Sequence, residues 1–265
     1  MRTSLRSGLG AARNLTKLLA PGLYRRVSFH RNEGRLRRIA QKIIRRFGPV
    51  VVAGPFKGMK LTPTVAEAVY NPMLVGCYEA ELETVIETVI TRNYDLLVDI
   101  GCAQGYYAVG LLLRMPKSRC VAFDMDETAR RLCRDMGKIN AVCDRLETRG
   151  RCEAAELDPI LSRRAFILCD CEGAELELLD PASVPALACC DILVELHDFI
   201  VPAITQTIVQ RFHTTHAVQI IEAVQKEPSR YSQLSFLNPK ERAMAVREHR
   251  PAGMRWAWLQ TKATP

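Results

Sequence analysis

Acidic side chains follow apolar runs of this 265-residue chain at spacings that suit the binding of a nucleoside. The first run, Leu96–Ile100, contains Asp99 and leads into a loop with glycines at positions 101 and 105. A second run ends in Asp124, twenty-five positions after Asp99. A strand, a glycine loop, a helix and a second strand that ends in an acid form a nucleotide-binding βαβ unit. The second acid of such a unit can accept hydrogen bonds from ribose hydroxyls.

The composition of this loop favours S-adenosylmethionine over a dinucleotide. A dinucleotide site needs G-x-G-x-x-G, because the pyrophosphate approaches bare backbone at a helix N-terminus, and only two glycines stand here. S-adenosylmethionine has no phosphate, and its sulfonium and amino-acid tail suit an acid such as Asp99. We therefore predict S-adenosyl-L-methionine as the cofactor. The contacts expected within this unit are Asp99, Gly101, Cys102, Ala103, Gln104, Gly105, Asp124 and Met125.

Two later apolar runs also lead into residues that can move protons or hold cations. These residues are Asp170, Glu172, Glu175, Glu195, His197 and Asp198. Such carboxylates could take a proton from a substrate hydroxyl, hold a divalent cation together with His197, or cap the following helix. Helix capping competes most strongly at Glu175, and His197 could also be a satisfied structural histidine.

The catalytic candidates are therefore four residues at these two strand ends. Asp170 or His197 would act as the base, and Glu172 and Glu195 would orient the substrate or a cation. We assign no metal. If a divalent cation is bound, Asp170, Glu195 and His197 are the residues that would hold it.

Strand and helix patterns alternate through the body of the chain. Seven strands are predicted over residues 94–100, 119–124, 146–150, 165–170, 191–196, 217–222 and 255–261, with helices between most of them. A further helical stretch, residues 64–91, is expected to break near Asn71-Pro72. This alternation predicts an α/β fold, a mostly parallel sheet with helices on both faces. Right-handed crossovers would bring the acid-bearing strand ends to one edge, where ligands bind.

Three segments together resemble the FkbM-type methyltransferases. Asp170-Cys-Glu-Gly-Ala-Glu175 resembles the Asp-x-Glu-Gly-Ala-Glu motif of that family, Gly76–Leu82 resembles its Gly-x-Tyr-Glu segment, and Val194–His197 resembles its Glu-x-His. The resemblance covers about residues 54–222. It implies a class I, Rossmann-like methyltransferase fold and methyl transfer from S-adenosylmethionine, often to an oxygen of a sugar or another natural-product scaffold.

The resemblance also bears on individual residues. It implies that Asp99, Gly101 and Asp124 contact the cofactor and that Asp170 lies near the reacting centre. It adds Tyr78 and Glu79 of the upstream segment, and Asp170 itself, to the expected cofactor contacts. The expected acceptor is a small molecule with a hydroxyl group.

The positive charge of the chain is concentrated at its N-terminus. Of the net charge of +8, residues 1–47 contribute +12 and the remainder −4. We predict a basic helical arm over 1–47 and a methyltransferase domain over 48–265. The residues Leu36, Ile39, Ala40, Ile43, Ile44 and Phe47 follow a helical face. The arm could dock on the body with a solvated basic face, contact an anionic membrane or nucleic acid, or, over residues 1–32, act as a mitochondrial transit peptide.

The ten cysteines indicate a reducing compartment rather than a disulfide framework. Several stand in predicted strands or on buried helix faces, and none has the paired spacing of a zinc site. These cysteines are Cys120, Cys133, Cys169, Cys189 and Cys190. We expect a cytoplasmic protein, or a mitochondrial one if a transit peptide is present. Two other classes stay open: a non-catalytic binding protein that uses the arm, and an NAD(P)-dependent oxidoreductase.

Overall fold

The computed structural model describes residues 21–63, 69–161, 165–248, 250 and 253–262. Side chains of residues 21–32 are not described, so the expectations for residues 1–32, including a transit peptide, lie outside these residues. The seven strands are β1 (Leu96–Ile100), β2 (Arg119–Phe123), β3 (Leu146–Arg149), β4 (Ala165–Cys169), β5 (Asp191–Leu196), β6 (His216–Glu222) and β7 (Arg255–Thr261). All seven predicted strands are thus confirmed, within a few residues at their ends.

Most of the predicted helices are also present. They are α2 (Pro21–Phe47), α3 (Tyr70–Val75), α4 (Glu83–Arg92), α5 (Tyr106–Arg114), α6 (Glu127–Ile139), α7 (Ala154–Ile160), α8 (Glu175–Leu178), α9 (Ile204–Phe212) and α10 (Pro239–Ala245). Short 3-10 helices lie at Ala80–Leu82, Cys143–Arg145, Pro185–Cys189, Pro228–Arg230 and Ser232–Leu234.

The predicted helix break at Asn71-Pro72 is wrong. Helix α3 begins at Tyr70, so Pro72 lies in its first turn, where the missing N–H removes no intrahelical hydrogen bond. The break comes instead at Gly76, which has φ +81°. A Cβ at this position would lie 1.9 Å from the carbonyl oxygen of Ala53, so glycine is required there.

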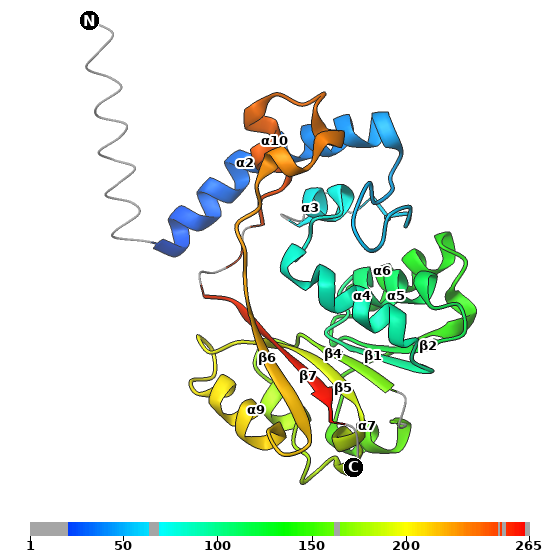
Figure 1. Ribbon diagram of the computed structural model, residues 1–265. Helices are drawn as coiled ribbons and strands as arrows, with labels where there is room; N and C mark the ends of the chain where they lie inside the picture. Colours follow the sequence, from blue (N-terminus) through cyan, green and yellow to red (C-terminus); the bar gives the residue numbers. More distant parts are fainter. Residues whose placement is uncertain (1–20, 64–68, 162–164, 249, 251–252, 263–265) are drawn as a thin grey trace, which may run out of the picture.

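The strands form one sheet in the order β3-β2-β1-β4-β5-β7-β6. Strands β3, β2, β1, β4 and β5 are parallel, and β7 runs antiparallel to both of its neighbours. Figure 1 shows α4, α5 and α6 on one face of the sheet and α7 and α9 on the other. The expected fold, a seven-stranded mostly parallel sheet of the Rossmann-like, class I methyltransferase type, is confirmed.

The apolar residues of each strand divide between two cores because successive side chains point to opposite faces. Leu97, Cys120 and Phe166 pack with α4, α5 and α6, whereas Val98 and Val121 pack with the helices of the other face. Strands buried on both faces read as continuous apolar runs, which is why the sequence marked them clearly.

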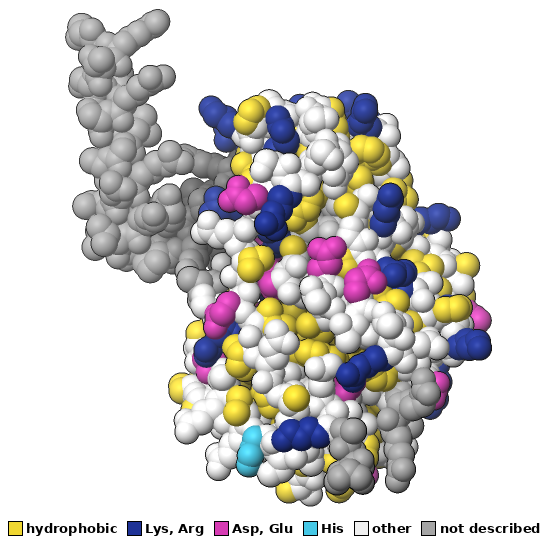
Figure 2. Space-filling view, in the orientation of Figure 1, with side chains coloured by type: hydrophobic (Ala, Val, Ile, Leu, Met, Phe, Trp, Pro, Cys, Tyr) yellow, Lys and Arg dark blue, Asp and Glu magenta, His cyan; other side chains and the backbone are white. Residues whose placement is uncertain are grey.

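Helix α2 packs on the body along the face that the spacing predicts. Ile39 and Ile43 are 2% and 0% exposed and belong to the same core as α4 and α5, whereas Arg45 and Arg46 are exposed. Lys42 pairs with Glu241 of α10 at 2.6 Å. Figure 2 shows Lys and Arg side chains at the top of the molecule, where α2 and α10 lie. Residues 36–47 therefore form a docked helix with a basic outer face.

The ten cysteines all lie among the described residues, and all are free thiols. Seven are buried, as expected for small apolar side chains. Cys189 is an exception to the prediction, because it is exposed at the end of the 3-10 helix Pro185–Cys189. Among the described residues, no helix has the length and apolar character needed to cross a bilayer.

Candidate active site

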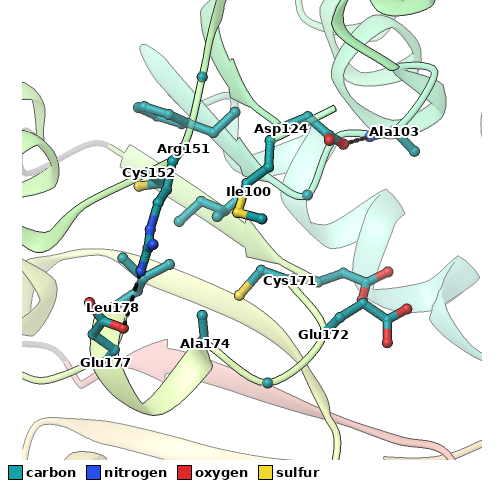
Figure 3. A pocket seen from close by; sticks show the side chains of 16 residues that line it. Ile100, Ala103, Asp124, Arg151, Cys152, Cys171, Glu172, Ala174, Glu177 and Leu178 are labelled. Carbon is teal, nitrogen blue, oxygen red and sulfur yellow. Dashed lines mark hydrogen bonds and ion pairs between the residues drawn. The ribbon is translucent and has the colours of Figure 1, made fainter. Parts of the chain in front are cut away.

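A cavity of about 620 Å³ opens at the carboxyl edge of the parallel strands. Its wall contains segments that follow β1, β2, β3 and β4, so it lies where open α/β sheets bind ligands. This volume is in the range of small-molecule sites. The residues of the wall are Ile100, Gly101, Ala103, Phe123, Asp124, Met125, Gly150, Arg151, Cys152, Asp170, Cys171, Glu172, Gly173, Ala174, Glu177 and Leu178 (Figure 3).

The loop after β1 is held by hydrogen bonds to its own surroundings. The amides of Gly101 and Cys102 both donate to the carbonyl oxygen of Phe123 at 2.9 Å, and the Gly105 amide donates to Cys102. The Ala103 amide donates to the Asp124 carboxylate at 2.9 Å. These amides are therefore engaged and do not form an open cradle for a phosphate group.

Glycine is required at position 101 for two reasons. Its φ is +86°, and a Cβ there would lie 1.7 Å from the carbonyl oxygen of Asp170. The loop after β1 thus lies directly against the loop after β4. This close approach brings the two parts of the site that the sequence singled out into contact.

Asp124 is anchored and still able to accept further hydrogen bonds. Its Oδ2 accepts from the Ala103 amide and its Oδ1 from the Asp126 amide, both at 2.9 Å. Each carboxylate oxygen has two lone pairs, so one acceptor position on each oxygen is not used by these bonds. Figure 3 shows the carboxylate turned toward Ala103 at the cavity wall. Next to it, Met125 is 74% exposed and lines the same cavity.

Asp99 lies behind the loop and is absent from the cavity wall. It is 4% exposed, and its Oδ2 accepts a hydrogen bond from the Ala108 amide in the first turn of α5. Burial raises the pKa of Asp99 to about 7, although the Ala108 bond acts against this rise. The structure therefore gives Asp99 a role as the cap of α5.

The eleven predicted cofactor contacts divide into two groups. Gly101, Ala103, Asp124, Met125 and Asp170 line the cavity. The other six do not line the cavity: Tyr78, Glu79, Asp99, Cys102, Gln104 and Gly105. Of these, Gln104 is buried, with its Nε2 3.0 Å from the sulfur of Met73, and Tyr78 and Glu79 line a separate small cavity beside α5.

The four predicted catalytic residues come together around His197. The Nε2 atom of His197 lies 3.3 Å from Glu195, 3.6 Å from Asp170 and 3.7 Å from Glu172. His197 is fully buried, and its Nδ1 is 2.7 Å from the carboxylate of Glu175, which also accepts from the Gly173 amide. Helix capping was the strongest competing prediction for Glu175, and in the structure its carboxylate instead orients the ring of His197.

The charges of these groups shift one another's pKa. Burial acts to lower the pKa of His197, but the carboxylates of Glu175 and Glu195 outweigh it and raise this pKa to about 10. Burial acts to raise the pKa of Glu175, and the hydrogen bond from His197 brings it below its usual value. An imidazolium with this pKa is a poor proton acceptor at neutral pH, which argues against His197 as the base.

The pKa of Asp170 is raised, in contrast to that of Glu175. Burial raises the pKa of Asp170 well above the ordinary value, and the negative charges of Glu195 and Glu79 add to the rise. Its side chain is 28% exposed and faces the cavity. His197 is fully buried and does not line the cavity, so Asp170 is the better placed candidate for the base.

The sequence did not reveal Arg250, which joins the site from the C-terminal segment. Arg250 pairs with Glu79 at 2.7 Å and with Glu81 at 2.9 Å, and it also pairs with Glu195. Glu79 is also bonded to the hydroxyl of Tyr107, and burial raises the pKa of Glu79 to about 8. Arg250 is one of many basic residues, and no local sequence pattern marks it as part of the site. Arg151 and Cys152 of the cavity wall could have been predicted from the sequence, because they follow the end of strand β3.

Comparison with known proteins gives distant structural likeness only. No protein-family model matches the chain, and no curated protein matches its sequence. A putative rRNA-methylase from Clostridium thermocellum is 10% identical at a TM-score of 0.49, covering 70% of this chain and 97% of that one. The O-methyltransferase TomG from Streptomyces achromogenes, solved in complex with SAM, is 13% identical at a TM-score of 0.47, covering 86% and 98%. MccD is 12% identical at 0.44, covering 70% and 97%. The FkbM-type subfamily stays a prediction.

Proposed function

We propose that this protein is a methyltransferase that moves the methyl group of S-adenosylmethionine to a hydroxyl oxygen of a small molecule. The observation that carries this proposal is the cavity at the carboxyl edge of the sheet. Asp124, with unused acceptor positions, stands on one part of its wall, and Asp170 stands on another beside a cluster of carboxylates. A nucleoside with a cationic sulfonium matches these two features.

Each part of the cofactor has a suitable partner in this arrangement. Asp124 would accept hydrogen bonds from the ribose hydroxyls, and the apolar groups of Phe123, Met125 and Leu178 would contact the adenine. The sulfonium would lie toward Asp170, whose acidic neighbours Glu172, Glu175 and Glu195 outnumber the two cations beside them, Arg250 and His197. A cationic ligand would relieve part of that imbalance.

Methyl transfer requires an in-line approach of the acceptor oxygen and removal of its proton. The sulfonium is already a good leaving group, so the protein mainly contributes alignment and a base. We assign the base to Asp170, because it faces the cavity, whereas His197 does not line it. Glu195 and Glu172 would orient the acceptor hydroxyl.

The same geometry disfavours a nicotinamide cofactor. A pyrophosphate needs free backbone amides at the loop after β1, and the amides of Gly101, Cys102 and Ala103 already donate within the protein. The four proposed catalytic residues lie together beside the cavity, which disfavours a non-catalytic binding protein.

The proposal is tested by calorimetric titration of the full chain with S-adenosylmethionine, its demethylated product and NADH. We expect micromolar binding of the first two, none of NADH, and at least tenfold weaker binding in Asp124→Ala. Asp126→Ala is the matched control, because Asp126 caps α6 through the Thr128 amide and does not line the cavity. If neither sulfur compound binds, the proposed function is wrong.

Turnover is tested separately with a panel of hydroxyl acceptors. Asp170→Asn should abolish methyl transfer and leave the affinity for S-adenosylmethionine within a few-fold of wild type, since the amide cannot take the proton. Full activity in this variant would remove Asp170 from the mechanism.

A further inference from the structure

Three side chains bring potential metal ligands together beside the cavity. One oxygen each of Asp170 and Glu172 and one ring nitrogen of His197 all lie within 4.8 Å of one another. Nε2 of His197 is 3.6 Å from Asp170 Oδ1 and 3.7 Å from Glu172 Oε2. Glu195 adds a fourth candidate, with its Oε2 3.3 Å from the same nitrogen. Ligands bound at about 2.1 Å to one ion lie about 3 Å or more apart, so these atoms need only small movements to share an ion.

Two of these atoms are buried and lack a hydrogen-bond partner. Nε2 of His197 and Oδ1 of Asp170 have no hydrogen bond in the structure, although His197 is fully buried. A buried polar atom without a partner is costly, and native proteins rarely retain one unless a water or an ion satisfies it. Both atoms belong to the same cluster, so a single bound ion would satisfy them together.

The ring of His197 is oriented as a metal ligand requires. Its Nδ1 is 2.7 Å from Glu175, which is itself fully buried and accepts a second hydrogen bond from the Gly173 amide. A carboxylate that accepts from one ring nitrogen fixes the tautomer and leaves the other nitrogen to bind a metal. Glu195 is held in a similar way, because its Oε1 pairs with Arg250 and its Oε2 faces His197.

We propose that Asp170, Glu172, His197 and Glu195 bind one divalent transition-metal cation of the Mn²⁺ type. One imidazole with several carboxylate oxygens suits such an ion better than Ca²⁺ or Mg²⁺, which prefer oxygen ligands alone. On binding, the cation displaces the Nε2 proton that the imidazolium of His197 carries, and this proton leaves to solvent. The chemical role of the site rests on the proposed function: the ion would bind the acceptor oxygen and make its hydroxyl more acidic, and Asp170 would bind the ion through Oδ1 and take the proton on Oδ2. Binding itself does not depend on that role.

The test is titration of Mn²⁺ into the full-length, chelator-treated chain, followed by the electron paramagnetic resonance signal of free Mn²⁺. We expect one ion bound per chain, and Mg²⁺ should compete weakly. Glu172→Gln should weaken binding at least tenfold, and because Glu172 is an exposed residue this variant should fold normally. Glu177→Gln is the matched control, an exposed acid of the same cavity wall outside the cluster, and should bind as wild type.

Glu175→Gln tests the positioning of the histidine. It should weaken Mn²⁺ binding by about 10- to 100-fold, as loss of a partner behind a metal ligand usually does. Absence of saturable binding, or equal weakening in Glu172→Gln and Glu177→Gln, would overturn the cation site. Titration with S-adenosylmethionine in the same samples separates the two proposals: binding of the nucleoside without Mn²⁺ removes only the cation site, and binding of Mn²⁺ alone removes only the proposed function.

Discussion

At the scale of single residues, Asp99 shows that an acid in a strand beside the candidate site can have a structural role. The residue is buried and caps the first turn of α5 through the Ala108 amide. Its raised pKa of about 7 means that the fold disfavours the charged form. The free energy that burial of this charge costs can therefore be measured from the pH dependence of the stability.

Asp99→Asn should make the stability of the protein less dependent on pH. Between about pH 4 and 7, the folded chain retains a proton on Asp99 that the unfolded chain has released, so wild-type stability contains a component that falls as the pH rises. The asparagine keeps an acceptor for Ala108 and carries no charge. Relative to wild type, the variant should therefore gain stability over this range, by at most a few kcal/mol at about 1.4 kcal/mol per pKa unit.

Urea unfolding of both proteins at several pH values measures this difference. Asp99→Ala is the control, because it removes the acceptor and should be less stable than Asp99→Asn at every pH. A difference between wild type and Asp99→Asn that does not change with pH would show that Asp99 ionises normally.

At the scale of elements, the contact between the loops after β1 and β4 depends on Gly101. Gly101→Ala should destabilise the protein by more than about 4 kcal/mol, since it adds both backbone strain and a clash with Asp170. Gly58→Ala separates the two effects, because Gly58 has φ +91° but has open space where the Cβ would lie. It should cost only about 1–2 kcal/mol. Chemical unfolding measures both values, and equal losses would show that the clash is absent.

Helix α2 is part of the folded core over residues 36–47, and its packing can be tested directly. Ile43 is fully buried against the core, so Ile43→Ala should cost about 2–5 kcal/mol. Arg45→Ala on the exposed face should change stability by no more than about 0.5 kcal/mol. If both variants unfold like wild type in a thermal or urea titration, the docking of α2 contributes nothing to stability.

The elements were more predictable than the site. Apolar strands and helical spacing mark a fold whose sheet is buried on both sides, so the sequence identified all seven strands. The capping by Asp99 and the orientation of His197 by Glu175 could not be predicted, because they depend on side-chain directions across separate elements. Arg250 reaches the site from more than 50 residues beyond His197, and no periodic pattern encodes such a contact.

At the scale of the whole molecule, the sheet edge joins two chemically different regions. One is the cavity bounded by Asp124 and apolar side chains, and the other is the cluster of acids around His197 and Arg250. Asp170 belongs to both regions. This position suits a residue that acts between a cofactor and an acceptor, and it explains why the same edge can hold both proposed ligands.

The ten free thiols report on the folded state and on the cavity together. Cys143 and Cys189 are exposed and should react rapidly with a thiol reagent in the native protein. Cys171 is partly exposed and lines the cavity, so it should react more slowly, and saturating S-adenosylmethionine should slow it further. The six buried cysteines that do not line the cavity should react only on unfolding. Peptide mapping by mass spectrometry follows each site, and Cys143 serves as the internal control. Protection of Cys171 alone is expected if the ligand occupies the cavity, whereas equal slowing of Cys143 and Cys171 would contradict occupancy of the cavity.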